Sequence, residues 1–235
     1  MLLYKGWLET RLRLLFSLAF FGIFLIQAHM MNGAVPPAGV KPEPLKVFAV
    51  TQIFLVATLC GMVAGAGIAT QPAFQGAKGL HGSMLFTLSL PVSRLRLLAV
   101  RAGLGWLEMI FGTAAMGAGL WIVFPVVRAA TTVPEIFEYT LALIGCGSAL
   151  YFVGVFLATF LDEQWRVFGN MISFAALWWV PNHTPWPASA NIFRAMGEGS
   201  PLFTHAMPWA AMGVSLALAA ILFLAALKVV RAREY

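Results

Sequence analysis

The sequence predicts an all-α membrane protein, and three observations support that prediction. Apolar side chains make up 60% of its 235 residues and charged side chains only 10%. A soluble globular domain carries about 25% charged residues, so this chain has too few to cover a water-exposed surface. The charges also lie between long uncharged stretches, each with the roughly twenty apolar residues that a helix needs to cross a bilayer. The alternating pattern of barrel strands is not seen, so helices are the expected elements.

A single transmembrane domain over 1–235 is predicted to hold six membrane-spanning helices. Their ranges are 14–30, 47–70, 100–127, 139–161, 166–181 and 207–230. By length alone the first range also fits a signal peptide. It has no small-x-small cleavage site, and Arg11 and Arg13 flank it like an anchor, so we favour a membrane span.

The basic residues predict the orientation of these spans. With a cytoplasmic N-terminus, eleven of the fifteen Lys and Arg residues lie inside. The four outside are Lys41, Lys46, Arg128 and Arg194. This bias follows the positive-inside rule. We therefore expect a multi-pass protein of the bacterial cytoplasmic (inner) membrane with both termini cytoplasmic. Topology explains the net charge of +6, so no nucleic-acid partner is expected.

Residues 2–13 predict an amphipathic helix before the first span. Lys5, Glu9 and Arg13 lie four residues apart on one helical face, and Trp7 lies among the apolar residues of the other. Such a helix rests in the plane of the lipid headgroups. The alternative is a merely charged start to the first span.

The cytoplasmic link between the second and third spans is apolar but too short to cross the membrane. In this link Met84 and Leu88 lie four residues apart, with Leu85 between them, as on one face of a helix. Pro91 ends that helix, and Ser93 is placed to cap the next one. From these residues alone, a plain interfacial helix and a docking surface explain the segment equally well.

The outer connection between the fifth and sixth spans has a central stretch, ASANIFRAMGEG, with helical character. Ser189 or Asn191 is a suitable N-cap, and Gly197 and Gly199 are suitable ends. A short helix that dips into the outer leaflet and an ordinary loop are both compatible with it. Four tryptophans form an aromatic belt around this connection: Trp178, Trp179, Trp186 and Trp209.

No catalytic or metal-binding constellation is found in the sequence. The four histidines are widely spaced, and the chain has no HExxH, GxSxG or P-loop motif. Glu108 is the one ionisable residue well inside a span, two turns beyond Arg101, and such a residue marks a functional site by default. We favour a structural hydrogen bond to a neighbouring span, because a lone acid lacks a catalytic partner at its depth.

Small residues in the spans predict packing positions. Cys60 and Cys146 lie within apolar runs and are expected to be small core residues and not a disulfide. Gly61 and Gly65, and Gly112 with the small residues after it, have the small-xxx-small spacing that permits close helix contacts.

Several segments together resemble the permease subunits of type-2 ATP-binding-cassette (ABC) exporters. They are YKGWLETRLRLL at 4–15, HGSMLFTLSLPVSRLRLLAVRAG at 81–103, SPLFTHAMPW at 200–209 and the terminal VVRAREY. The resemblance covers essentially the whole chain in order, and TLSLPVSRLRL at 87–97 is its most specific part.

This resemblance implies a dimer of permeases, each docked on a separate P-loop ATPase subunit. Residues 76–93 would form the coupling helix, 2–13 the interfacial helix, and 182–206 short extracytoplasmic re-entrant helices. The ATPase-coupling residues would be His81, Met84, Leu85, Leu88, Pro91 and Arg94. No cofactor or metal is expected on this chain, since ATP and Mg would bind the ATPase, and the second permease is an identical or a sister chain. Membrane lipids would surround the permease dimer.

Two other function classes remain open alternatives. An intramembrane lipid-modifying enzyme needs at least two catalytic groups at similar depth, whereas Glu108 is alone in the sequence pattern. An ion-coupled secondary carrier often has inverted repeats, and the two halves of this chain show none. The expectation is therefore a permease without enzymatic activity of its own.

Overall fold

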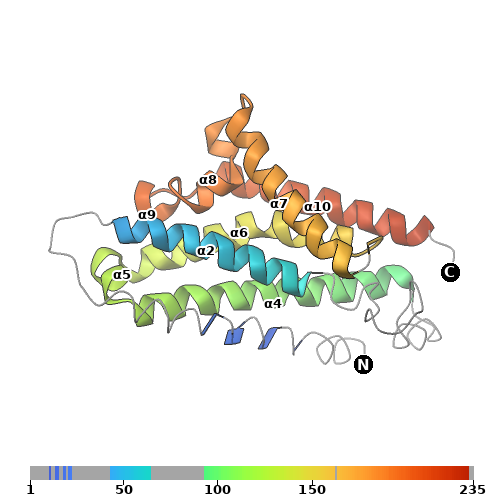
Figure 1. Ribbon diagram of the computed structural model, residues 1–235, viewed down its shortest axis with the longest axis horizontal. Helices are drawn as coiled ribbons and strands as arrows, with labels where there is room; N and C mark the ends of the chain where they lie inside the picture. Colours follow the sequence, from blue (N-terminus) through green and yellow to red (C-terminus); the bar gives the residue numbers. More distant parts are fainter. Residues whose placement is uncertain are drawn as a thin grey trace.

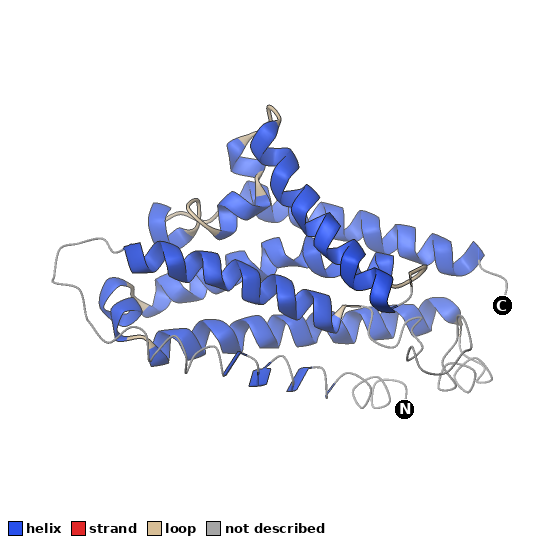
Figure 2. Ribbon diagram, viewed as in Figure 1, coloured by secondary structure: helices blue, strands red, loops and turns tan. Residues whose placement is uncertain are grey.

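The computed structural model describes residues 43–64, 93–161 and 163–232, together with scattered positions between 11 and 22. The described residues form helices and their connections and contain no strand (Figure 2). The all-α prediction is therefore confirmed for this part of the chain. The predicted interfacial helix, most of span 14–30 and the predicted coupling segment up to Pro91 lie outside the described residues.

The described residues form five long helices, with three short helices on the connection between the last two (Figure 1). The long helices are α2 (Glu43–Val63), α4 (Arg94–Val123), α6 (Val133–Leu157), α7 (Glu163–His183) and α10 (Trp209–Ala232). The helix α6 lies at the centre, in contact with each of the other four. Three helices are long and apolar enough to cross a membrane, namely Leu95–Val123, Val133–Leu157 and Trp209–Ala232.

Contacts along α6 establish how its neighbours run. Ala49 and Val56 of α2, and Ala64 directly after it, meet successively later residues of α6, so α2 and α6 are parallel. Along α4 the order is reversed, because Gly105 meets Tyr151 whereas Gly117 meets Thr140. The chain therefore reverses direction between α4 and α6, as consecutive spans must.

The helix α4 begins where the sequence predicts and ends earlier. Ser93 caps its first turn, with Arg96 N donating to Ser93 Oγ at 3.3 Å. The predicted span ran on to 127, and this was wrong, because the helix breaks at Phe124. Pro125 has no N–H to continue the ladder and instead opens the separate short helix α5 (Pro125–Ala130).

The helix α6 begins six residues before the predicted start at 139. Thr132 and Glu135 form a capping box, in which Thr132 N donates to Glu135 Oε2 at 2.7 Å. Pro134 lies in the first turn, where a missing N–H costs nothing. The predicted start at 139 leaves Glu135 outside the span because the spans were bounded by charge, but the first turn of a helix favours acidic residues. The helix ends at Leu157, before the predicted 161.

The remaining spans differ from prediction by two to four residues at most of their described ends, but α2 ends at Val63, seven residues before the predicted 70. The helix α2 starts at Glu43 and not at 47, again with a proline, Pro44, in its first turn. The helix α7 extends beyond 166–181 at both ends, to Glu163 and His183. The helix α10 covers Trp209–Ala232 against the predicted 207–230.

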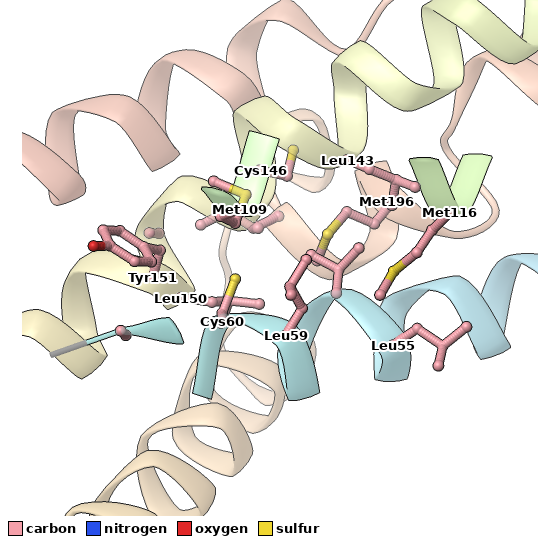
Figure 3. Packing of buried hydrophobic residues seen from close by; sticks show 14 of the residues in the cluster. Leu55, Leu59, Cys60, Met109, Met116, Leu143, Cys146, Leu150, Tyr151 and Met196 are labelled. Carbon is pink, nitrogen blue, oxygen red and sulfur yellow. The ribbon is translucent and has the colours of Figure 1, made fainter. Parts of the chain in front are cut away.

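The hydrophobic core lies between α2, α4 and α6, and a short outer helix closes it. Figure 3 shows the side chains of Leu59, Met116 and Met196 converging, and all three are less than 3% exposed. Cys60 and Cys146 are both buried and free, as predicted. Of the predicted close-contact glycines, Gly112 lies against Leu59, whereas a Cβ at Gly61 would have no atom of the described residues within 4 Å.

Candidate functional site

The site residues that the sequence predicts fall into two groups in the structure. His81, Met84, Leu85, Leu88 and Pro91 of the coupling segment, and Lys5, Trp7 and Glu9 of the interfacial helix, lie outside the described residues. Arg94 is the first residue of α4, and Glu108 lies in the middle of that helix. The structure thus places one end of the predicted coupling segment and the intramembrane acid on the same helix.

Glu108 lies inside the bundle and away from its lipid-facing surface. Its side chain is 3% exposed, and that of Arg101, two turns earlier on α4, is 7% exposed. A structural role for Glu108 requires such a buried position, and that role stays a prediction.

Tyr151 connects α6 to α4 through a hydrogen bond that the sequence does not reveal. Its hydroxyl donates to the carbonyl oxygen of Ala102 at 2.9 Å, and the side chain is 1% exposed. The ring fits because position 105 is glycine, since a Cβ there would overlap the Tyr151 hydroxyl. Gly105 and Ala102 of α4 therefore form one packed contact with Tyr151 of α6.

Further polar contacts join α6 to α4 and to α10. Trp106 Nε1 donates to Ser148 Oγ at 3.1 Å, which joins α4 to α6. Ser215 of α10 donates from Oγ to the Cys146 carbonyl at 2.8 Å and accepts from Ala149 N. These hydroxyls bond backbone and indole groups of neighbouring helices, which is what polar residues do to hold membrane helices together. Within the described ranges, no group of three His, Cys, Asp or Glu residues is placed to bind a metal ion.

The packing of Tyr151 on Gly105 leads to a testable stability prediction. Gly105→Ala should destabilise the protein by about 1–3 kcal/mol, because the new methyl group displaces the Tyr151 hydroxyl from its partner. In the double variant with Tyr151→Phe, the oxygen is gone and the nearest ring carbon stands 3.3 Å from the methyl position. We expect the double variant to melt close to Tyr151→Phe alone, as measured by thermal unfolding in detergent. Simple addition of the two losses would contradict this packing.

The outer connection folds into three short helices, and its central helix has the predicted capping. They are η1 (Ala188–Ala190), α8 (Ile192–Met196) and α9 (Pro201–Thr204). Asn191 Oδ1 accepts hydrogen bonds from Phe193 N and Arg194 N, both at 3.1 Å. Gly197 follows the last residue of α8. The predicted short helix is therefore present, with Asn191 and not Ser189 as its cap.

These short helices are packed into the bundle and are not an open loop. Ile192, Phe193 and Met196 are all under 8% exposed, and Phe193 packs edge-on against Phe174 of α7 at 4.9 Å between ring centroids. Asn191 Nδ2 also donates to Asn182 Oδ1 at 2.9 Å, near the end of α7. The outer end of the bundle is therefore closed by its own chain.

An ion pair fastens the end of α9 to the start of α6. His205 Nδ1 lies 3.1 Å from Glu135 Oε1, while the other oxygen of Glu135 serves the capping box. His205 has the left-handed conformation, φ 52°, that ends α9. Sequence reasoning placed both residues on the outer side, but their pairing depends on the tertiary fold.

Comparison of the chain with protein families, with curated proteins and with solved structures finds no match.

Proposed function

We propose that this chain is the membrane-spanning permease subunit of an ATP-driven ABC exporter. In this proposal two permeases pair to form the substrate path, and each docks on a separate P-loop ATPase that binds ATP and Mg. ATP binding closes the ATPases, and residues 76–93 pass that movement to the spans. The role of the chain is mechanical, and it carries out no chemical step.

The observation that carries the proposal is the outer helix pair. The resemblance implies short re-entrant helices within 182–206, and α8 and α9 occupy that part of the chain. They are buried against α6, whereas a plain loop would lie on the surface. The side chain of Asn191 caps α8, so the sequence itself encodes the start of this short helix.

The interior of the bundle also favours a mechanical role. The hydroxyl groups of Tyr151 and Ser215 donate to backbone carbonyls of neighbouring helices, and the Ser148 hydroxyl accepts from the Trp106 indole, so these groups hold helices together. Glu108 is enclosed by the helices of its own subunit. A catalytic acid would need access to a substrate and a second group at its depth.

The exposure of α7 supports pairing with a second permease. None of its side chains that the structure describes is buried, and its apolar residues Trp165, Phe168 and Ile172 are each more than 55% exposed. The helix leans away from the rest of the bundle (Figure 1). Part of this face is available to a second copy of the chain, and lipid covers the remainder.

The proposal is tested by a tagged pull-down from native membranes in mild detergent, followed by mass spectrometry. We expect a soluble P-loop ATPase in an amount close to that of the permease. The matched control is an unrelated tagged six-span protein from the same membranes. Recovery of the chain alone, or only with itself, would overturn the proposal.

A further inference from the structure

A pocket of about 400 Å³ lies between the outer short helices and the start of α10. Its walls are built mainly from small residues, with Ala188, Ala195, Ala206 and Ala210 among them. Because these side chains end at Cβ, they leave room that larger residues would fill. The pocket is open to the outside, so a ligand reaches it without any change in the bundle.

Arg194 is the only charged residue that lines this pocket. Two hydrogen bonds hold its backbone in α8. The Arg194 N–H donates to Asn191 Oδ1, and the Arg194 carbonyl oxygen accepts from Gly199 N at 2.8 Å. The one carboxylate nearby in sequence, Glu198, is not part of the lining. The described residues offer no ion pair to the Arg194 guanidinium. Arg194 therefore presents a positive charge to the pocket from a fixed backbone position, with Ser189 as another polar residue of the lining.

The pocket leads onto an exposed apolar stripe of α10. Trp209, the first residue of that helix, lines the pocket and is 69% exposed. Gly213, Leu216, Ala220 and Leu224 follow it along one exposed side of the helix. Trp178, Trp179 and Trp186 are also exposed, at the same outer end. Tryptophan at the end of a membrane-crossing helix marks the level of the lipid headgroups.

We propose that this pocket binds the phosphodiester headgroup of an anionic phospholipid of the outer leaflet. The Arg194 guanidinium pairs with the phosphate, since its planar fork fits two phosphate oxygens. Trp209 contacts the glycerol region, and an acyl chain lies along the α10 stripe, where Gly213 and Ala220 leave a shallow depression. The occupant is a resident lipid, and the proposal does not depend on the transport function.

The test is native mass spectrometry of the delipidated full chain titrated with phosphatidylglycerol or with zwitterionic phosphatidylcholine. We expect phosphatidylglycerol to bind more tightly, and Arg194→Gln to weaken it by about tenfold. Ala206→Trp, which fills the pocket from its rim without changing charge, should weaken it to a similar degree. The matched control is Arg128→Gln, which removes an exposed arginine outside the pocket and should leave binding unchanged.

Three outcomes would overturn the proposal. Equal binding of the two lipids would show that the pocket does not recognise the charge of the headgroup. An equal loss of phosphatidylglycerol affinity in the Arg128 and Arg194 variants would show that only the net charge of the protein matters. Displacement of phosphatidylglycerol by millimolar inorganic phosphate would assign the pocket to a free anion. Melting curves of each variant show that the fold is intact, and Ala206→Trp tests the site separately from the arginine.

Discussion

The double substitution Met84→Glu and Leu88→Glu is expected to abolish capture of the ATPase while the permease still inserts and folds. Both residues lie on the apolar face predicted for the coupling helix. If that face docks in a cleft, each carboxylate would be buried without a partner, at a cost of several kcal/mol. Since 1.4 kcal/mol is a factor of ten, binding should fall by more than about a hundredfold.

The measurement is the ratio of ATPase to permease in the tagged pull-down, with melting temperature as the check on folding. Ser83→Glu is the matched control, because on the same predicted helix Ser83 lies about 100° or more around the axis from Met84, Leu85 and Leu88. We expect it to keep the ratio of the unaltered chain. If the double variant keeps that ratio too, residues 76–93 are not the docking segment.

Local signals were enough to make α8 one of two interpretations of its segment, with an ordinary loop as the other. An asparagine cap and a terminal glycine act within a few residues of the helix that they bound, so Asn191 and Gly197 could be recognised without the fold. The capping of α4 by Ser93 is a second case. The capping hydrogen bonds of Asn191 and Ser93 join residues two or three positions apart, and Gly197 directly follows the last residue of α8.

The errors at helix ends have equally local causes. The spans were bounded by charge, and this rule misplaces a helix whose first turn holds Glu135. The motif Thr132-Val133-Pro134-Glu135 is a recognisable capping box, so its sequence signal was available. The break at Phe124 could likewise have been read from Pro125, because proline inside a helix removes a hydrogen bond.

The polar core could not be predicted from the sequence in the same way. Gly61 and Gly112 share the small-residue spacing, yet among the described residues only Gly112 meets another helix. The spacing identifies faces that permit close approach, whereas the rotation of each helix decides which face is used. The contact of Tyr151 with Ala102 joins positions 49 residues apart, and it depends on that rotation in both α4 and α6.

Gly154→Ala is expected to give the largest loss of stability among single glycine substitutions in the bundle. A Cβ at position 154 would lie 2.5 Å from the Cβ of Ala64, where α2 crosses α6. That atom is attached directly to the backbone, so no side-chain rotation relieves the overlap and the helices must separate. Overpacking of this kind costs about 1–3 kcal/mol, partly offset by the better helix propensity of alanine.

Two variants make the measurement of melting temperature in detergent specific to this contact. Gly213→Ala has no atom within 4 Å of the new methyl group, so it should melt at or slightly above the temperature of the unaltered protein. The exchange Ala64→Gly with Gly154→Ala moves the methyl group from one helix to the other and should recover most of the lost stability. Because the methyl group then occupies the same gap from the opposite side, recovery would locate the cost at the α2–α6 crossing. If Gly154→Ala instead melts like Gly213→Ala, the two helices do not approach at these residues.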